Sequence, residues 1–423
     1  MITDWLAEHA ALRETAGVID LSFRSRICLV GADRARYLHG QVTNDVKKLR
    51  VGDGCYSAVT TAKGKMESDL NIFALADELL LDFEPGLAEK ISARLERFIV
   101  ADDVQIVDAA PHYGLLSVQG PKAAEVINAL GLFGVGWGER PRELLTPTTP
   151  DGSSVASPHQ FPTKPFASMK ISDATLGEIY LVNHARLSLV AAGILPAVEP
   201  AFQPGGTVVA NPTHKESLHA TPDGKMPPSK AGGTPAAPIF GFDLFVPNNS
   251  LGAVADKLIA AAKQLGGRAV GWQAFASARI EAGIPRFGAD MDETKIPLEC
   301  AIESRAIVYN KGCYIGQEVI NRIHSVGHVN KELRALRLAT NLEGPLPVKG
   351  DKLFHAGKEV GYVTSAVKSP TLNTNIALGY VRREANQIGN ETDVADGGGR
   401  KSGENCGVAV CEMISLKDRS RQD

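Results

Sequence analysis

Two short stretches in the second half of the chain carry the residue types and spacing most able to do chemistry. They are R-I-E-A-G-I-P-R-F-G-A-D at 279–290 and K-G-C-Y-I-G-Q-E-V-I-N-R at 311–322. In the second stretch Gly312 and Gly316 bracket Cys313, so the backbone can approach a ligand closely and the thiol is expected on a loop. The pattern therefore predicts a reactive cysteine beside a binding site.

The surroundings of Cys313 favour that reactivity. Lys311 lies two residues before it, and a helix is expected to begin near Gly316. A nearby ammonium group and a helix N-terminus both favour the thiolate over the thiol. The alternative is a structural turn whose cysteine only fills space, and the residue types alone do not separate the two interpretations.

The remaining candidate clusters carry weaker signals. His324 and His328 have the spacing of one helix face, but Gly327 lies between them and no third metal ligand is evident. Two partly exposed polar residues are the better interpretation, and no metal site is expected. The glycine-dense stretch 131–138 lacks the preceding strand and following helix of a phosphate-binding loop, so an ordinary loop is expected there.

The elements that must position these residues alternate between short strands and helices through the first 130 residues. Hydrophobic periodicity predicts strands at 26–30, 70–75, 78–83, 104–107 and 113–118, and helices at 4–15, 34–38, 85–100 and 121–129. A strand at 240–246 and a helix at 251–265 are expected further on. Short strands at 333–338, 352–354, 361–366 and 376–381 suit a small β-barrel.

Two segments, 141–165 and 196–238, are rich in Pro, Gly, Ser and Thr and poor in aromatic residues. Such segments bury too little apolar surface to offset chain entropy, so an irregular loop and a loosely ordered insertion are expected. The predicted division is then an N-terminal α+β module at 1–140, the loop and insertion with a short ordered segment at 141–238, a second α+β module carrying the cysteine motif at 239–329, and a C-terminal β-barrel at 330–423.

Composition excludes several classes of protein. The chain has 423 residues, of which 44% are hydrophobic and 22% charged, enough for several domains. Its net charge of -3 provides no global positive field, so no direct nucleic-acid partner is expected. No apolar run approaches the ~18 residues of a membrane span, and residues 1–17 lack the apolar core of a signal peptide. With six dispersed cysteines unlike a disulfide framework, the expectation is a cytoplasmic protein without membrane contact.

The two motif stretches together resemble the YgfZ group of folate-binding proteins, relatives of the aminomethyltransferase, or T-protein, of the glycine cleavage system. K-G-C-Y-I-G-Q-E is a rare string, and R-I-E-A-G-I-P is its upstream partner. R-E-T-A-G-V-I-D-L-S at 13–22 is similar to the T-protein opening, and the strings at 30–46 and 62–70 are similar to both branches. The resemblance implies an α+β body of two modules that binds tetrahydrofolate, followed by a C-terminal β-barrel.

The resemblance also implies a catalytic carboxylate. In T-proteins an aspartate in a G-G-x-x-D-D-L-like string orients the folate and its methylene-bearing amine. The matching residue here is Asp69 in E-S-D-L, and Ser68 departs from the first aspartate of that pair. A carboxylate also suits a pterin independently, because it can accept two parallel N–H bonds from the ring edge. The alternative for Asp69 is a surface turn residue.

Further side chains are implied around the folate. Arg279 falls where T-proteins place an arginine near the folate, whose glutamate tail is anionic. Phe275 stands where the YgfZ protein has a folate-contacting tryptophan, so an aromatic face for stacking is retained. The other expected binding residues lie in the two motif stretches: Glu281, Lys311, Tyr314, Gln317 and Arg322. There are two departures, since Arg24 replaces a second folate-contacting tryptophan and Ile239 replaces the first glutamate of a T-protein string.

Two functions are compatible with the resemblance. The first is a tetrahydrofolate-binding protein of the YgfZ type, which supports maturation or repair of iron–sulfur proteins, tRNA-modifying enzymes included, and has iron–sulfur client or assembly proteins as partners. Cys313 and the lost glutamate favour it, because T-proteins lack that cysteine. The alternative is a folate-dependent aminomethyltransferase of the T-protein type. A scaffold that has lost ligand binding is a third possibility. We expect the first, with Asp69 and Cys313 as the reactive residues and with turnover left open.

Overall fold

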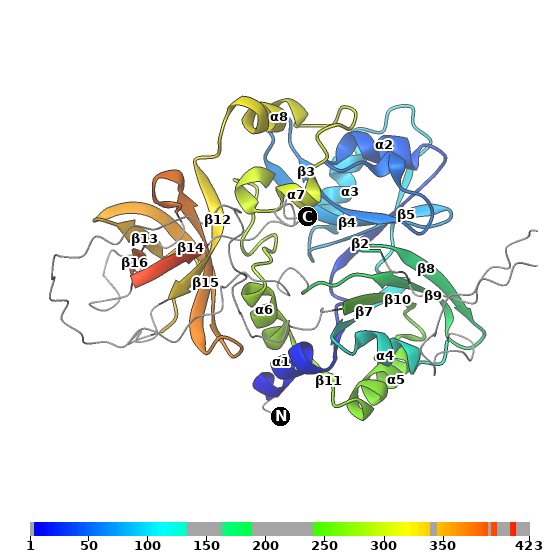
Figure 1. Cartoon of the computed structure of the whole chain (residues 1–423). Helices are drawn as coiled ribbons and strands as arrows, with labels where there is room; N and C mark the ends of the chain where they lie inside the picture. Colours follow the sequence, from blue (N-terminus) through cyan, green and yellow to red (C-terminus); the bar gives the residue numbers. More distant parts are fainter. Residues whose placement is uncertain are drawn as a thin grey trace, which may run out of the picture.

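The computed structural model describes residues 4–132, 162, 164–187, 240–338, 345–387, 391–395 and 407–411. Within these ranges the chain forms two β-sheets flanked by helices, with a separate β-barrel beside them (Figure 1). This arrangement confirms the predicted α+β fold class. The predictions for 141–165 and 196–238 fall largely outside the described residues. No helix in the described ranges is long and apolar enough to cross a membrane.

The first sheet is antiparallel throughout and has the order β3-β4-β5-β2-β6. Its strands are β2 (Ser25–Val30), β3 (Gly54–Thr60), β4 (Met66–Ala74), β5 (Glu78–Phe83) and β6 (Gln105–Asp108). Helices α2 (Arg34–Gln41) and α3 (Ala88–Glu96) cover one face through an apolar cluster. The predicted pairing of 70–75 with 78–83 is confirmed as β4 against β5. The predicted helix 85–100 ends earlier, at Glu96, and Phe98 lies exposed under the Arg94 guanidinium.

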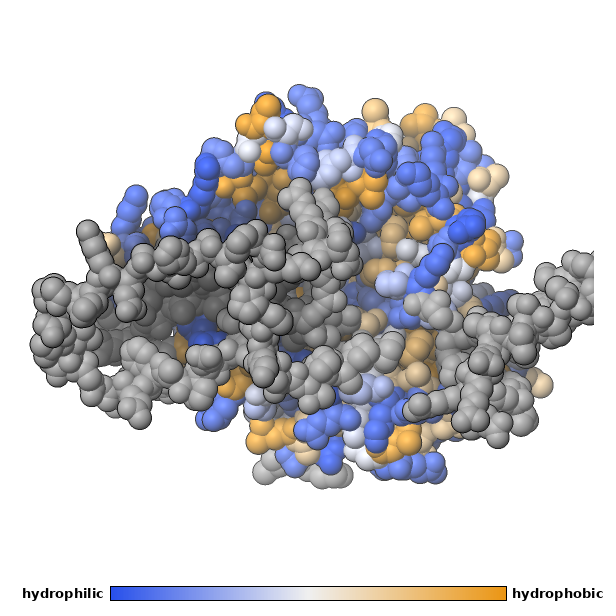
Figure 2. Space-filling view, in the orientation of Figure 1, coloured by the Kyte–Doolittle hydropathy of each residue, from blue (hydrophilic) through white to orange (hydrophobic). Residues whose placement is uncertain are grey.

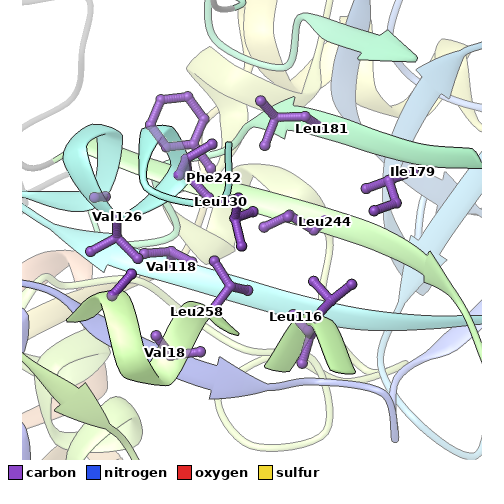
Figure 3. Packing of buried hydrophobic residues seen from close by; sticks show 14 of the residues in the cluster. Val18, Leu116, Val118, Val126, Leu130, Ile179, Leu181, Phe242, Leu244 and Leu258 are labelled. Carbon is purple, nitrogen blue, oxygen red and sulfur yellow. The ribbon is translucent and has the colours of Figure 1, made fainter. Parts of the chain in front are cut away.

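The second sheet, of order β11-β1-β7-β10-β9-β8, collects strands from distant parts of the chain. They are β1 (Gly17–Asp20), β7 (Tyr113–Gly120), β8 (Ser168–Asp173), β9 (Gly177–Asn183), β10 (Phe240–Pro247) and β11 (Arg268–Ala269). Because β10 pairs with β7 along its whole length, this sheet combines strands from both predicted α+β modules. Helices α4 (Ala123–Asn128) and α5 (Leu251–Gln264) pack on it (Figure 3).

The inner faces of the two sheets meet in a core that also holds the helix of the first motif. Phe73 of β4 and Phe245 of β10 lie 5.6 Å apart between ring centroids. The same cluster includes apolar residues of α1 (Trp5–Glu14) and α6 (Trp272–Glu281). Helix α6 is therefore anchored between the two sheets.

The second motif leads from the body into the barrel. After η3 (Pro297–Cys300) and α7 (Glu303–Ala306), the chain turns at Gly316 and enters α8 (Gln317–Val326). The predicted helix start near Gly316 is confirmed. Gly316 has φ of 90°, and a Cβ there would lie 2.5 Å from the Thr61 carbonyl oxygen, so only glycine fits this contact.

The C-terminal region forms the predicted barrel, which closes in the order β12-β15-β14-β13-β16-β17. Its strands are β12 (Lys331–Leu338), β13 (Lys352–His355), β14 (Lys358–Ser369), β15 (Thr374–Arg382), β16 (Glu391–Ala395) and β17 (Gly407–Cys411), with η4 (Arg383–Ala385) after β15. A register shift between Val363 and Ser365 lets two successive hydroxyls, of Thr364 and Ser365, both donate to Asp290 Oδ1, at 2.7 and 2.6 Å. The bulge thus docks the barrel onto the first motif.

Candidate functional site

A half-buried aspartate, Asp69, lies in the middle of β4. Asp69 pairs with Ala58 of β3, so Tyr56 lies diagonally opposite on the same face of the sheet. The Tyr56 hydroxyl donates to Asp69 Oδ2 at 2.8 Å. The other oxygen, Oδ1, is buried and has no hydrogen-bond partner within the described chain. The surface-turn alternative for Asp69 is therefore wrong.

A network of charged groups lies on the same face of the sheet. Arg24 donates to Asp82 Oδ1 at 2.8 Å and to Glu84 Oε1 at 2.7 Å. Arg186 bridges Asp82, at 3.0 Å, to Asp243 of β10, at 2.7 Å. The network therefore connects the two sheets, and Arg24 and Glu84 place it within the electrostatic range of Asp69. Arg24, which replaces an expected aromatic residue, is an integral member of it.

The network also sets the proton affinity of the Asp69 carboxyl group. Burial, assisted by the negative charge of Glu84, raises the pKa of Asp69 to about 6, against the opposing influence of Tyr56 and Arg24. Asp82 shows the contrary outcome: although burial opposes its ionisation, Arg24 and Arg186 hold its pKa well below the ordinary value. One face of the sheet thus carries a permanently ionised carboxylate and a carboxyl group that exchanges a proton near neutral pH.

Aromatic side chains border this network. Arg286 lies 3.3 Å from Glu84 and stacks over the Trp272 ring at 4.9 Å. Trp272, which is 38% exposed, meets the exposed Phe23 edge-to-face at 5.3 Å. The rings of Phe23 and Trp272 and the Arg286 guanidinium therefore form a chain of contacts that reaches Glu84, a member of the charged network. Such surfaces accept flat, conjugated ligands.

The three predicted binding residues of α6 are occupied by contacts within the protein. Phe275 is buried in the core between the sheets, with its ring 5.7 Å from Trp272. Arg279 is buried and pairs with Asp290, while its Nη2 donates to Ser365 of the barrel at 3.1 Å. Contact of Arg279 with an anionic ligand tail would compete with this pair.

Glu281 is likewise surrounded by protein donors. Its carboxylate accepts hydrogen bonds from the Arg13 guanidinium and the Ser369 hydroxyl, both at 2.5 Å, and His9 Nε2 lies 2.8 Å away. These partners come from α1 and from the barrel. Glu281 therefore joins the amino-terminal helix to the barrel, and a role toward the ligand stays a prediction.

The structure corrects the expected effect of Lys311 on Cys313. The buried Lys311 ammonium donates to three carbonyl oxygens, those of His39, Val42 and Asn44, at 2.6, 2.6 and 2.7 Å. Burial lowers the pKa of Lys311 to about 8. The thiol whose pKa the Lys311 charge influences is that of Cys55. Lys311 thus holds the end of α2 and the following turn. Sequence proximity misled because the ammonium group is held by these carbonyl oxygens and lies over the Tyr314 ring, at 4.9 Å.

The rest of the second motif divides into buried and exposed residues. Cys313 is exposed, whereas Cys28 and Cys300 are buried. Tyr314 is buried, and its hydroxyl has no hydrogen-bond partner among the described residues. Gln317 is half-buried at the start of α8, and Arg322 is exposed on that helix. The motif therefore presents its thiol to solvent and its tyrosine ring to the core.

Several residues of the site were not predicted from the sequence. Tyr56 could have been found, because it stands two residues from the strand position opposite Asp69. Phe23, Trp272 and Arg286 carried no usable signal, because their contacts join segments up to about 250 residues apart that only folding brings together. In the described ranges no group of three or more His, Cys, Asp or Glu side chains could hold a metal ion.

Comparisons with known proteins match both parts of the chain. A family model described as the GCVT N-terminal domain matches residues 1–133 and 240–311. A second, the glycine cleavage T-protein C-terminal barrel domain, matches residues 331–407. The first match omits 134–239, which includes β8 and β9.

Individual relatives are similar over nearly the whole chain. The aminomethyltransferase of Listeria monocytogenes serotype 4b (strain CLIP80459) is 23% identical over 389 residues, which cover 92% of this chain and 84% of that protein. The aminomethyltransferase of Corynebacterium jeikeium (strain K411) is 25% identical over 384 residues, 90% of this chain and 82% of that protein. Among solved structures, the glycine cleavage system aminomethyltransferase T from Bartonella henselae superposes with a TM-score of 0.68 at 20% identity, over 97% of this chain and 88% of that one. That structure shares the fold.

Proposed function

This chain belongs to the glycine cleavage T-protein family, defined by the GCVT N-terminal and C-terminal barrel domains, and we propose that it is a tetrahydrofolate-dependent aminomethyltransferase. The proposal favours the alternative function in the sequence analysis over the YgfZ-type role expected there. The relatives named above are aminomethyltransferases, and nothing in the comparisons supports an iron–sulfur role.

The observation that carries the proposal is the unpartnered Oδ1 of Asp69. A buried carboxylate oxygen without a donor loses its hydration and gains nothing in return, which costs roughly 1–3 kcal/mol. A ligand that brings N–H groups to this oxygen recovers that free energy. The pterin ring and the amine nitrogens of tetrahydrofolate supply such donors, and Tyr56 keeps Oδ2 occupied so that Oδ1 faces the ligand.

The proton affinity of Asp69 fits transfer of a one-carbon unit between amines. With a pKa of about 6, the carboxyl group is mostly ionised at pH 7 yet close enough to neutrality to take up or give back a proton. Making and breaking a methylene–amine bond requires such a proton exchange at nitrogen. Phe23 and Trp272 provide partly exposed rings for the conjugated parts of the ligand.

Binding is the first test. Isothermal titration calorimetry with tetrahydrofolate should show that Asp69→Asn weakens binding by about 10–100-fold, the equivalent of roughly 1.5–3 kcal/mol for a hydrogen bond to a charged group. Glu67→Gln is the matched control, because it neutralises a carboxylate on the same strand that pairs with Arg94. Equal affinity in Asp69→Asn and wild type would contradict the assignment of Asp69.

Turnover is the second test. With tetrahydrofolate added as the acceptor, the purified protein should form methylene-tetrahydrofolate from an aminomethylated carrier protein and release the amino group as ammonia. Asp69→Asn should lose this activity, while Cys313→Ser keeps it. Tetrahydrofolate binding without turnover on any aminomethylated carrier would contradict the transferase proposal.

One observation favours a second candidate function, the YgfZ-type support of iron–sulfur proteins. Cys313 is exposed at the loop before α8, where a chemical role needs it and a packing role does not. Under this candidate Cys313→Ser would fold and bind tetrahydrofolate normally, yet would fail to restore iron–sulfur enzyme activity in cells that lack such a factor. Full restoration by Cys313→Ser would exclude it.

A further inference from the structure

A polar cleft lies away from Asp69, between the end of α8 and the start of the barrel. It consists of two adjoining concavities of about 230 and 790 Å³, which share His328, Lys331 and Arg383. Arg382 lines the larger one and His324 the smaller. Figure 2 shows hydrophilic side chains along the surface that descends from α8 toward the barrel. Neither the family match nor the proposed function assigns a role to this cleft.

The strand register places two of the cations directly opposite each other. Lys331 of β12 and Arg382 of β15 are cross-strand partners, so their side chains leave the same face of the sheet side by side. Like charges in this position destabilise a sheet. Arg383 follows immediately, and His328 lies three residues before Lys331. The start of the barrel therefore concentrates positive charge at a cost to folding.

The carboxylates of the cleft compensate this charge only in part, through the influence of Glu299 on Lys331. Glu303 contacts the Tyr309 hydroxyl and His324, and Glu332 pairs with Arg334. Glu299 accepts the backbone N–H of Ile296, and Glu384 lies 3.9 Å from Lys358. Each acid that lines the cleft thus has its own partner.

Among the described residues, the four cations shared by the start of the barrel, His328, Lys331, Arg382 and Arg383, have no carboxylate within ion-pair distance. No side-chain hydrogen bond or ion pair is recorded within the described chain for His328, Arg382 or Arg383. The Lys331 ammonium lies over the Tyr362 and Tyr380 rings, at 5.8 and 5.6 Å, and no ion pair within 4 Å joins it to a carboxylate of the described residues. Burial and the neighbouring Lys295 lower the pKa of Lys331, as expected where positive charge is crowded.

We propose that this cleft binds a compact polyanion, whose oxygens are held by Arg382 and Arg383 with Lys331 and His328 beside them. One guanidinium group can donate two parallel N–H bonds to two oxygens of a phosphate or carboxylate, and a lysine adds a compact positive charge. Phosphate groups and clustered carboxylates share this chemistry. Either one relieves the repulsion between Lys331 and Arg382, so ligand binding should also stabilise the fold.

Pyrophosphate and citrate serve as the two probes, titrated by calorimetry at constant ionic strength. The Arg382→Gln/Arg383→Gln double variant should lower the affinity for the better probe at least tenfold, and Lys331→Gln should lower it severalfold. Arg50→Gln, which removes an exposed arginine before β3, should bind as wild type does. Tighter binding of pyrophosphate identifies a phosphate ligand, and tighter binding of citrate identifies a carboxylate ligand.

Two further results bear on the proposal. Without ligand, Arg382→Gln should raise the melting temperature, because it removes the cross-strand repulsion, and pyrophosphate should then stabilise it less than wild type. Asp69→Asn should leave binding of the probes unchanged, which separates this cleft from the folate site. Absence of binding for both probes, or an equal loss in Arg50→Gln, would overturn the proposal.

Discussion

The contact between the barrel and the body should depend strongly on the charge of Asp290. This carboxylate is 2% exposed and forms an ion pair with Arg279. It also accepts hydrogen bonds from the Thr364 and Ser365 hydroxyls of the bulge and, at 3.1 Å, from the backbone N–H of Arg286. In Asp290→Asn the amide oxygen can still accept some of these bonds, but Arg279 remains buried without a counter-charge. Breaking a buried ion pair in this way costs about 3–5 kcal/mol.

Smaller changes at the same contact provide the scale. Thr364→Val removes one hydrogen bond to the charged group and should cost roughly 1.5–3 kcal/mol. Urea unfolding followed by circular dichroism gives both losses. Combining Asp290→Asn with Arg279→Met should cost less than the sum of the two single changes by at least about 1 kcal/mol, because the residues act as a pair. Additive losses, or a loss below about 1 kcal/mol for Asp290→Asn alone, would refute this account of the docking.

Three other predictions concern titratable groups. Because the pKa of Asp69 is raised, ionisation of this carboxyl group destabilises the fold. The stability that the protonated group contributes is fully present below about pH 4 and is lost as the pH rises through 6. Asp69→Asn should therefore unfold at a higher urea concentration than wild type at pH 7 and at an equal concentration at pH 4. Glu281 behaves oppositely. Despite burial, His9 and Arg13 lower its pKa to about 2, so its stabilisation is lost as the pH falls from 4.5 to 2, and Glu281→Gln should flatten the acid limb of a stability profile. Iodoacetamide followed by mass spectrometry should label the exposed Cys313 in the native protein well before the buried Cys28; equal rates would contradict the described burial.

Much of the local structure was predictable because local patterns determine it. Helix α5 has apolar residues at helical spacing and two glycines after it, and β4 and β5 are apolar stretches on either side of a short turn. The barrel followed from short strands separated by turn residues. The limits of α3 were less predictable: the helix ends at Glu96, and Phe98 lies exposed with its ring centroid 4.7 Å from the Arg94 guanidinium.

The sequence by itself determined the fold class, the relation to the T-protein family without its branch, and Asp69 as a candidate carboxylate, because each depends on a contiguous string or a short-range periodicity. Only the tertiary structure decided what surrounds that carboxylate. The direction of the Lys311 side chain depends on carbonyl groups some 270 residues away, and Arg24 reaches Asp82 and Glu84 through a strand pairing that no local pattern encodes. The crowding of Lys331 against Arg382 likewise follows from the register of two strands. Charges interact through space, so their partners are known only once the chain has folded.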